Sequence, residues 1–294
     1  MGQVMSEHSA DTILAQAEAH WMSGETQQAR EAFRRARMLF HQAQDPEGEA
    51  NALAQMGDFE ADHDHWDEAG QAFAEARELY TRLGDQHGQG NVLVRLGRLA
   101  QARARIAEAE QYFQSAQEVF HAAGDLSGMA HVTKRRGHLA RDRGQHDVAL
   151  DHYHQALELY RRAADTLGCA HTLKGLASLH RRLGHADMAH QNFETARDLY
   201  AEAGDVLGEA AACRGLGHLL RQLGDHDGAV TALDAARQLY AAMGHLKAEA
   251  ETRLELAEDL APSDPTKARA HRKHAHDLFV RLGDVEQAGA IAVD

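Results

Sequence analysis

An internal repeat of 40 residues is the feature that most constrains how this chain can fold. The pair Gly-Asp recurs in that step at 84–85, 124–125 and 204–205. Two further series keep the same step: the small residues Gly57, Gly97, Gly137, Ala177, Gly217 and Ala257, and the aromatic or apolar residues Phe33, Phe73, Phe113, Tyr153, Phe193 and Leu233. A period of this length is typical of repeat architectures, because each unit buries its apolar face against its neighbours.

Each repeat is predicted to form two helices. Gly124 can end one helix at positive φ, and Asp125 can cap the next helix by accepting a backbone N–H. The first helix of that unit is expected over about 126–143 and the second from about 147, since apolar residues there follow helical spacing. In the last unit the pattern slips by one residue, which predicts a deletion near 262–265, in a turn.

Together these positions resemble the tetratricopeptide repeat family, in its longer 40-residue variety. The resemblance rests on the Gly-Asp pair, on Leu96-Gly97 and on the Leu-aromatic pair that recurs in each unit, and it covers residues 10–283. It implies an all-α fold, a right-handed superhelical solenoid of about seven helix-turn-helix units. We therefore expect an N-terminal tail at 1–9, a single solenoid over 10–283 and a partial C-terminal capping helix at 284–294.

Composition argues against several classes of protein. The chain has 31 Lys+Arg against 45 Asp+Glu, a net charge of −14, whereas a generic nucleic-acid binder carries a basic surplus. No apolar run is long enough to predict a membrane span, and residues 1–9 lack the pattern of a secretory signal. Cys169 and Cys213 fit neither a disulfide framework nor a zinc motif, so we expect two small core residues in a cytoplasmic protein. A loose match to the myristoylation pattern at Gly2 is short and common.

The resemblance also implies which side chains face a binding groove. In the family the first helix of each pair lines the concave surface, and four positions point inward, at −6, −3, +1 and +4 from the small residue typified by Gly97. In the four central units these sixteen positions hold seven Lys or Arg, four His and no acidic residue. The predicted groove residues are Asn91, Arg98, His131, Lys134, His138, Arg141, His171, Lys174, Arg181, Arg214, His218 and Arg221. The end units place acidic residues there instead, such as Glu18, Asp58, Glu251 and Glu258.

Other signatures of chemistry are lacking in the sequence. It contains no glycine-rich phosphate loop, no Gly-x-Ser-x-Gly elbow and no context for a Cys–His pair. Histidine clusters occur at 63–65, 152–154 and 271–276, but they occupy different places in their repeats and define no shared site. We therefore predict a protein that is not an enzyme and that needs neither a cofactor nor a metal.

A basic groove in an acidic chain predicts a non-enzymatic adaptor or scaffold. The groove would hold an acidic extended segment, or the C-terminus, of a partner protein through charge-assisted hydrogen bonds. RNA or a phosphorylated ligand in the same groove is an alternative, although the central groove lacks aromatic residues for base stacking. Self-association is a third hypothesis, with the C-terminal carboxylates of one copy in the groove of the next. Histidines that titrate near pH 6.5 would strengthen anion binding in acid.

Overall fold

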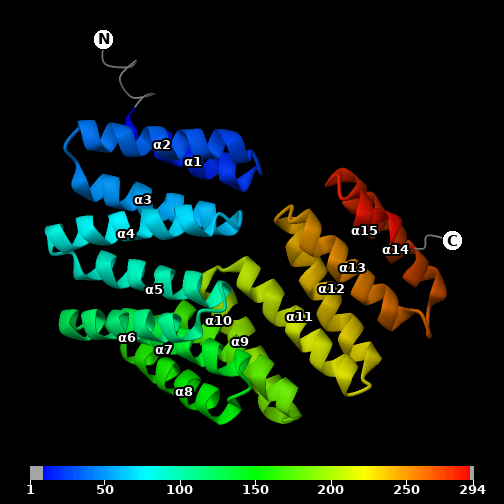
Figure 1. Ribbon diagram of the computed structural model, residues 1–294. Coiled ribbons are helices and arrows are strands. Elements are labelled where there is room, and N and C mark those ends of the chain that lie inside the picture. The colour runs from blue at the N-terminus through cyan, green and yellow to red at the C-terminus, as the bar shows by residue number, and fades with distance from the viewer. Residues whose placement is uncertain (1–8, 292–294) are drawn as a thin grey trace. The chain divides into compact units, whose positions relative to one another are not determined.

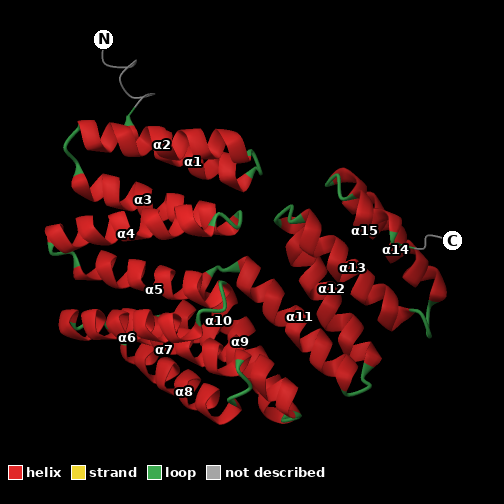
Figure 2. Cartoon of the chain, in the orientation of Figure 1, coloured by secondary structure: helices red, strands yellow, loops and turns green. Residues whose placement is uncertain are grey.

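The computed structural model describes residues 9–291, and within them the chain forms fifteen α-helices and no strand (Figure 1, Figure 2). In chain order the helices are α1 (Ala10–Met22), α2 (Thr26–Gln42), α3 (Pro46–Asp62), α4 (Trp66–Leu83), α5 (Gln86–Ala102), α6 (Ile106–Ala123), α7 (Leu126–Asp142), α8 (His146–Arg162), α9 (Thr166–Leu183), α10 (Ala186–Ala203), α11 (Val206–Gln222), α12 (His226–Ala242), α13 (Leu246–Leu260), α14 (Pro265–Arg281) and α15 (Val285–Gly289). The helices α1 to α14 form seven pairs, so the all-α solenoid of about seven units is confirmed.

The helix ends follow the chemistry that the repeat predicts. The Asp125 carboxylate accepts the N–H of Gly128 at 2.8 Å, and Asp85 and Asp205 cap α5 and α11 in the same way. Gly124 ends α6 in the left-handed region at φ 68°, where a glycine has no side chain to strain. Ala164 takes φ 54° at the matching place in the next repeat, so the turn geometry is kept even without glycine.

Close contacts between glycines and aromatic rings hold the helices together. A Cβ atom added to Gly57 would lie 2.4 Å from the Phe73 ring, which belongs to the second helix of the same pair. A Cβ atom on Gly88 would lie 2.4 Å from the ring of Tyr80, which precedes it on α4. Each ring therefore occupies the space that a side chain would take, and α4 is packed tightly against both α3 and α5.

The chain divides into two compact units, residues 1–139 and 140–294, each with its own core. In the first unit fully buried rings lie between successive helix pairs, at Phe33, Phe59, Phe73 and Phe113. In the second unit the corresponding layers are built on Phe193, Tyr240, Leu233 and Phe279. The second helices α2 and α4 in the first unit, and α8, α10 and α12 in the second, also pack against the first helix of the following pair.

The last repeat is shorter than the others where the sequence pattern slips. Helix α13 has 15 residues and ends at Leu260, and α14 begins at Pro265 behind an Asp264 cap.

No helix in the described part of the chain is long and apolar enough to cross a membrane. The Gly2 acylation pattern and the C-terminal carboxylates lie outside the residues that the structure describes.

We expect the substitution Gly57→Ala to destabilise the fold by about 1–3 kcal/mol, because the new methyl group overlaps the Phe73 ring. The midpoint of urea unfolding, followed by circular dichroism, measures the loss. The matched control is Gly70→Ala on α4, whose added Cβ would meet only the Leu99 side chain at 3.5 Å. That control should be neutral, or stabilising by up to about 1 kcal/mol, because alanine favours a helix. Equal effects of the two substitutions would contradict the packing argument.

Candidate functional site on the first helices

The first helices of successive pairs lie side by side and present the side chains that the repeat register selects. Helices α1, α3 and α5 adjoin in the first unit, and α9 adjoins α11 in the second. Tyrosines of the second helices hold several register positions in place. The Tyr80 hydroxyl donates to Asn51 Oδ1 at 2.6 Å, and the Tyr200 hydroxyl forms a hydrogen bond of 2.6 Å with His171 Nδ1. The Lys174 ammonium lies 5.8 Å from the centre of the Tyr200 ring, a cation–π contact.

In the first unit, cationic side chains of α5 and α7 gather around His131. Burial, together with the charges of Arg135, Lys134, Arg98 and Arg95, lowers the pKa of His131 to about 3. The imidazole is therefore neutral at pH 7, and its Nε2 atom accepts an N–H from Arg135 Nε at 3.3 Å. The expectation that all four groove histidines become charged near pH 6.5 is wrong for His131, because burial and the four neighbouring cations oppose a further positive charge on its ring.

The remaining predicted residues of this unit differ in exposure. Lys134 is buried, with 9% of its surface exposed, and Arg98 is exposed. Asn91 and His138 are half-buried. Arg98 forms no ion pair with any described residue, whereas the neighbouring Arg95 donates to Asp58 Oδ2 at 2.7 Å. Arg98 is thus the side chain of this group most accessible to an external anion.

In the second unit, α9 carries His171, Lys174 and Arg181 on its first-helix face. Burial lowers the pKa of Lys174, and the carboxylate of Asp205 offsets only part of this effect. Arg181 Nη1 reaches Gln222 Oε1 at 3.4 Å, and neither Lys174 nor Arg181 pairs with a carboxylate among residues 9–291. Arg141, at the end of α7, is instead engaged with its neighbour Asp142 at 2.8 Å.

The three predicted residues on α11 are committed to carboxylates of α13. Arg214 pairs with Glu255 at 2.6 Å and with Glu251 at 3.1 Å. His218 Nε2 lies 2.9 Å from Glu255 Oε2. Arg221 adds pairs at 2.9 Å to Glu258 and at 2.7 Å to Asp259. The prediction treated these side chains as part of an open basic stripe, whereas the fold neutralises them internally.

Two of these carboxylates were missed because they lie off the register. Glu255 and Asp259 each sit one residue beside an inward position of α13. Burial raises the pKa of Glu255, but hydrogen bonds and charges from His218 and Arg214 outweigh burial and lower it to about 2. The Asp259 side chain is only 2% exposed, and it also accepts from His226 Nδ1 at 3.0 Å. The acidity of Glu251 and Glu258 was the available signal that α13 complements α11.

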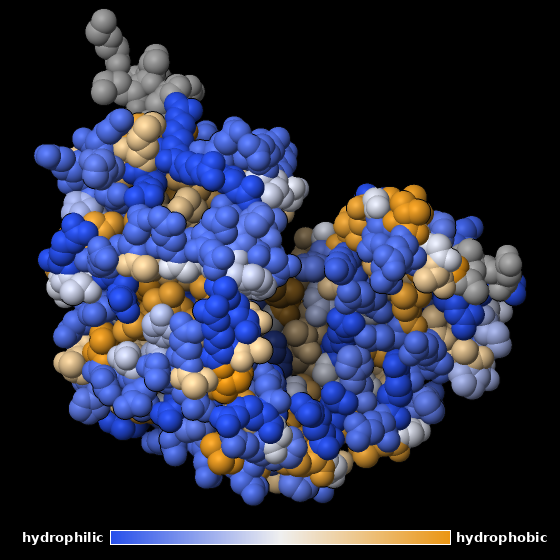
Figure 3. Space-filling model, in the orientation of Figure 1, coloured by the Kyte–Doolittle hydropathy of each residue, from blue (hydrophilic) through white to orange (hydrophobic). Residues whose placement is uncertain are grey.

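The hollows described on the surface lie elsewhere, along the second helices. The largest of them, about 750 Å³, is lined by residues of α10, α11 and α12, Cys213 and Leu216 among them. None of the predicted groove residues lines it. Figure 3 shows a mostly hydrophilic face on which apolar residues gather only in small patches. In residues 9–291 no three side chains of His, Cys, Asp or Glu come together as a metal site.

The repeat pattern and the helix pairs agree with a known family. The sequence profile of the tetratricopeptide repeat matches residues 48–121 and 128–202, about half of the chain. The chain belongs to the tetratricopeptide repeat family. No curated protein matches the sequence as a whole or in part.

Solved structures share this tetratricopeptide repeat fold at low sequence identity. BtubC from P. vanneervenii is 18% identical, with 78% of this chain and 92% of that chain covered and a TM-score of 0.59. Aspartyl phosphate phosphatase F from Bacillus subtilis is 14% identical, with coverages of 97% and 72% and a TM-score of 0.69. The Rap conjugation gene regulator of plasmid pLS20, in complex with the Phr* peptide, is 15% identical, with coverages of 94% and 75% and a TM-score of 0.61. At such identities the likeness shows the fold alone.

We expect Glu255→Gln to destabilise the chain by about 2 kcal/mol at pH 7, because it removes the charge that Arg214 and His218 stabilise. Because the pKa of Glu255 is lowered in the folded chain, its carboxylate stabilises the fold at pH values above its pKa in the unfolded chain, near 4.3. This stabilisation is lost as the pH falls toward 2. Urea unfolding at pH 7, 5 and 3 should show the gap between wild type and variant closing with acid. Glu258→Gln, at the exposed end of the same network, should cost less than about 1 kcal/mol. A gap that does not change with pH would contradict the assignment.

The His131 imidazole should remain neutral between about pH 8 and 5, because its pKa lies near 3 in the folded chain. An NMR titration of its ring protons should show no inflection in that range, whereas the same ring in the urea-unfolded chain should titrate near pH 6.5. The unfolded state then binds more protons, so this residue reduces stability as the pH falls from about 6.5 toward 3. An inflection near pH 6.5 in the folded protein would refute the neutral state.

Proposed function

We propose that this tetratricopeptide repeat protein is a non-enzymatic interaction module that binds an acidic segment of a partner protein on its first helices. Arg98 in the first unit and Lys174 with Arg181 in the second unit supply the cations. Each unit presents its own cations on its own first helices. Members of the family typically bind proteins or peptides, and the sequence contains no pattern of catalytic residues.

The contrast between α9 and α11 is the observation that carries this proposal. Both helices place cations at the −3 and +4 register positions. On α11 these cations bind the carboxylates of α13, at distances between 2.6 and 3.1 Å. On α9 the matching Lys174 and Arg181 form no ion pair with a carboxylate among residues 9–291, although Asp205 is near enough to act on the charge of Lys174. The carboxylates bound at these positions of α11 support an external carboxylate as the ligand of the matching cations on α9.

The complexes of similar structures support a peptide as the ligand class. The Rap regulator of plasmid pLS20 has the same fold and was solved with the Phr* peptide. A peptide also suits the chemistry, since Asp and Glu side chains and a free C-terminus all provide carboxylates at spacings that a row of helices can match. Each charge-assisted hydrogen bond contributes about 1.5–3 kcal/mol when its partner is in place.

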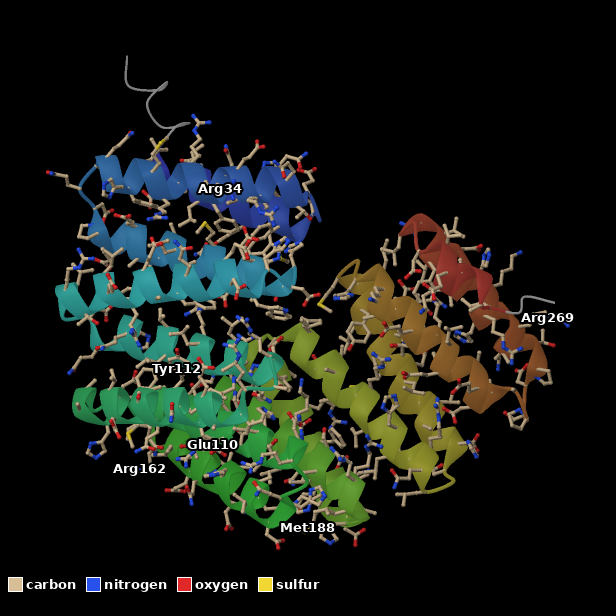
Figure 4. The ribbon with its side chains drawn as sticks, in the orientation of Figure 1. Arg34, Glu110, Tyr112, Arg162, Met188 and Arg269 are labelled. Carbon is tan, nitrogen blue, oxygen red and sulfur yellow. The ribbon has the colours of Figure 1, made fainter. Side chains whose placement is uncertain are left out.

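The test is the double substitution Arg98→Gln/Lys174→Gln, which removes two charges without creating carboxylates. Partners captured from native lysate by the wild type should bind the variant at least about tenfold more weakly, because two charge-assisted bonds are lost. The matched control is Arg269→Gln/Lys273→Gln on α14, where Arg269 points into solvent (Figure 4). The control should retain every partner.

Two further measurements decide the chemistry. Replacing Asp and Glu by Asn and Gln in the captured segment should abolish its binding to the wild type, measured by fluorescence anisotropy. Nuclease treatment of the lysate should leave capture unchanged. Retention of all partners by the Arg98→Gln/Lys174→Gln variant, with circular dichroism showing a folded chain, would rule out this surface as the binding site.

A further inference from the structure

A half-buried cation occupies a junction in the second repeat, where the end of a first helix, the turn after it and the preceding second helix meet. There the Arg30 guanidinium of α2 donates to Glu60 Oε2 at 2.8 Å and lies 2.7 Å from His65 Nδ1. Glu60 Oε2 and His65 Nδ1 are themselves 2.8 Å apart. One cationic atom thus binds two acceptors, a carboxylate oxygen from the end of α3 and an imidazole nitrogen from the turn to α4.

The same junction recurs three repeats later with a different set of side chains. Adding 120 residues to Glu60 and His65 leads to His180 at the end of α9 and His185 in the turn to α10. Their Nδ1 atoms are 3.2 Å apart. The position of Arg30 is taken by Leu150 of α8, which brings no charge. The junction therefore keeps two polar side chains that meet, one imidazole donating to the other, while no charged residue of α8 takes the register position of Arg30.

The spacing of the two nitrogens fits a metal ion. Zinc binds imidazole nitrogen at about 2.0–2.1 Å with tetrahedral angles, which places two such nitrogens about 3.3 Å apart. The ring centres of His180 and His185 are 5.5 Å apart and their planes are inclined by 44°, so neither ring blocks the other. His180 is 3% exposed, and its Nε2 atom has no hydrogen-bond partner in the described chain. Burying a histidine with one unpaired nitrogen reduces the stability of the fold. Such a residue, with its other nitrogen directed at a second imidazole, therefore calls for a functional explanation.

We propose that His180 and His185 bind a divalent transition-metal ion of the zinc type through their Nδ1 atoms. The ion takes the place that the Arg30 guanidinium has in the second repeat, and it replaces the proton that the two imidazoles otherwise share. No third ligating side chain converges with them among residues 9–291, so water completes the coordination. This site lies at the end of α9 and does not depend on the acidic ligand proposed for the first-helix face.

Zinc and cobalt(II) are the probes, added to the full chain in competition with a chromophoric chelator. The wild type should bind one equivalent that both His185→Ala and His180→Ala lose, with affinity lowered at least about tenfold. Alanine occurs at the matching positions Ala100 and Ala140, so His180→Ala is compatible with the fold. The control His274→Ala removes an exposed imidazole from α14 and should keep that equivalent.

Two readouts separate a specific site from binding by other histidines. Zinc should shift the ¹⁵N resonances of Nδ1 in both His180 and His185, and it should raise the melting temperature of the wild type but not that of His185→Ala. If His185→Ala binds zinc as tightly as His274→Ala does, or if the two Nδ1 resonances do not respond to zinc, the pair is a hydrogen bond and the metal site is refuted.

Discussion

The contact between an aromatic ring and a glycine on the facing helix is the interaction on which the rest of this structure depends. A ring such as Tyr80 fills the space beside Gly88, and Phe73 does the same at Gly57. Because neither glycine has a side chain, each second helix lies close to two first helices at once. Within each unit, first helices such as α3 and α5 are thereby set side by side, and their polar faces form a surface. The position of every candidate binding residue follows from that packing.

Many charges on this surface are paired with opposite charges of the same chain. The carboxylates of α13 neutralise the arginines of α11, and Asp58 of α3 pairs with Arg95 of α5. A net charge of −14 therefore says little about any one face. What remains for a partner are the cations that form no ion pair with a carboxylate among residues 9–291, such as Arg98 and Arg181. Local pairing, rather than composition, decides where an anion can bind.

One buried position illustrates how a repeat can keep its geometry and change its chemistry. At the matching ends of α3 and α9 a polar side chain is buried in the same junction: Glu60 and His180. Arg30 neutralises Glu60. His180 instead meets His185. Since a buried polar group needs a partner, each repeat meets the same requirement with the residues it has.

The local rules of the repeat were sufficient to predict the helices, their caps and their pairing. Asp125 caps α7 because its carboxylate reaches an amide three residues away. Gly124 ends α6 because the chain takes a positive φ there, which glycine adopts without strain. The register also placed Arg98 and Lys174 correctly on first helices. It failed for Arg214 and Arg221, because their partners lie about 40 residues later and, for Glu255 and Asp259, just beside the inward positions.

The sequence by itself thus determined the all-α repeat, since caps, small residues and aromatic residues act over distances of a few residues. Only the tertiary structure decided which cations are already paired and that His131 is neutral, because burial and charges from neighbouring helices control both. The approach of His180 to His185 was decided in the same way, by a turn that brings two imidazoles together. Pairing and ionisation depend on distances in space, and the order of residues along a chain does not contain them.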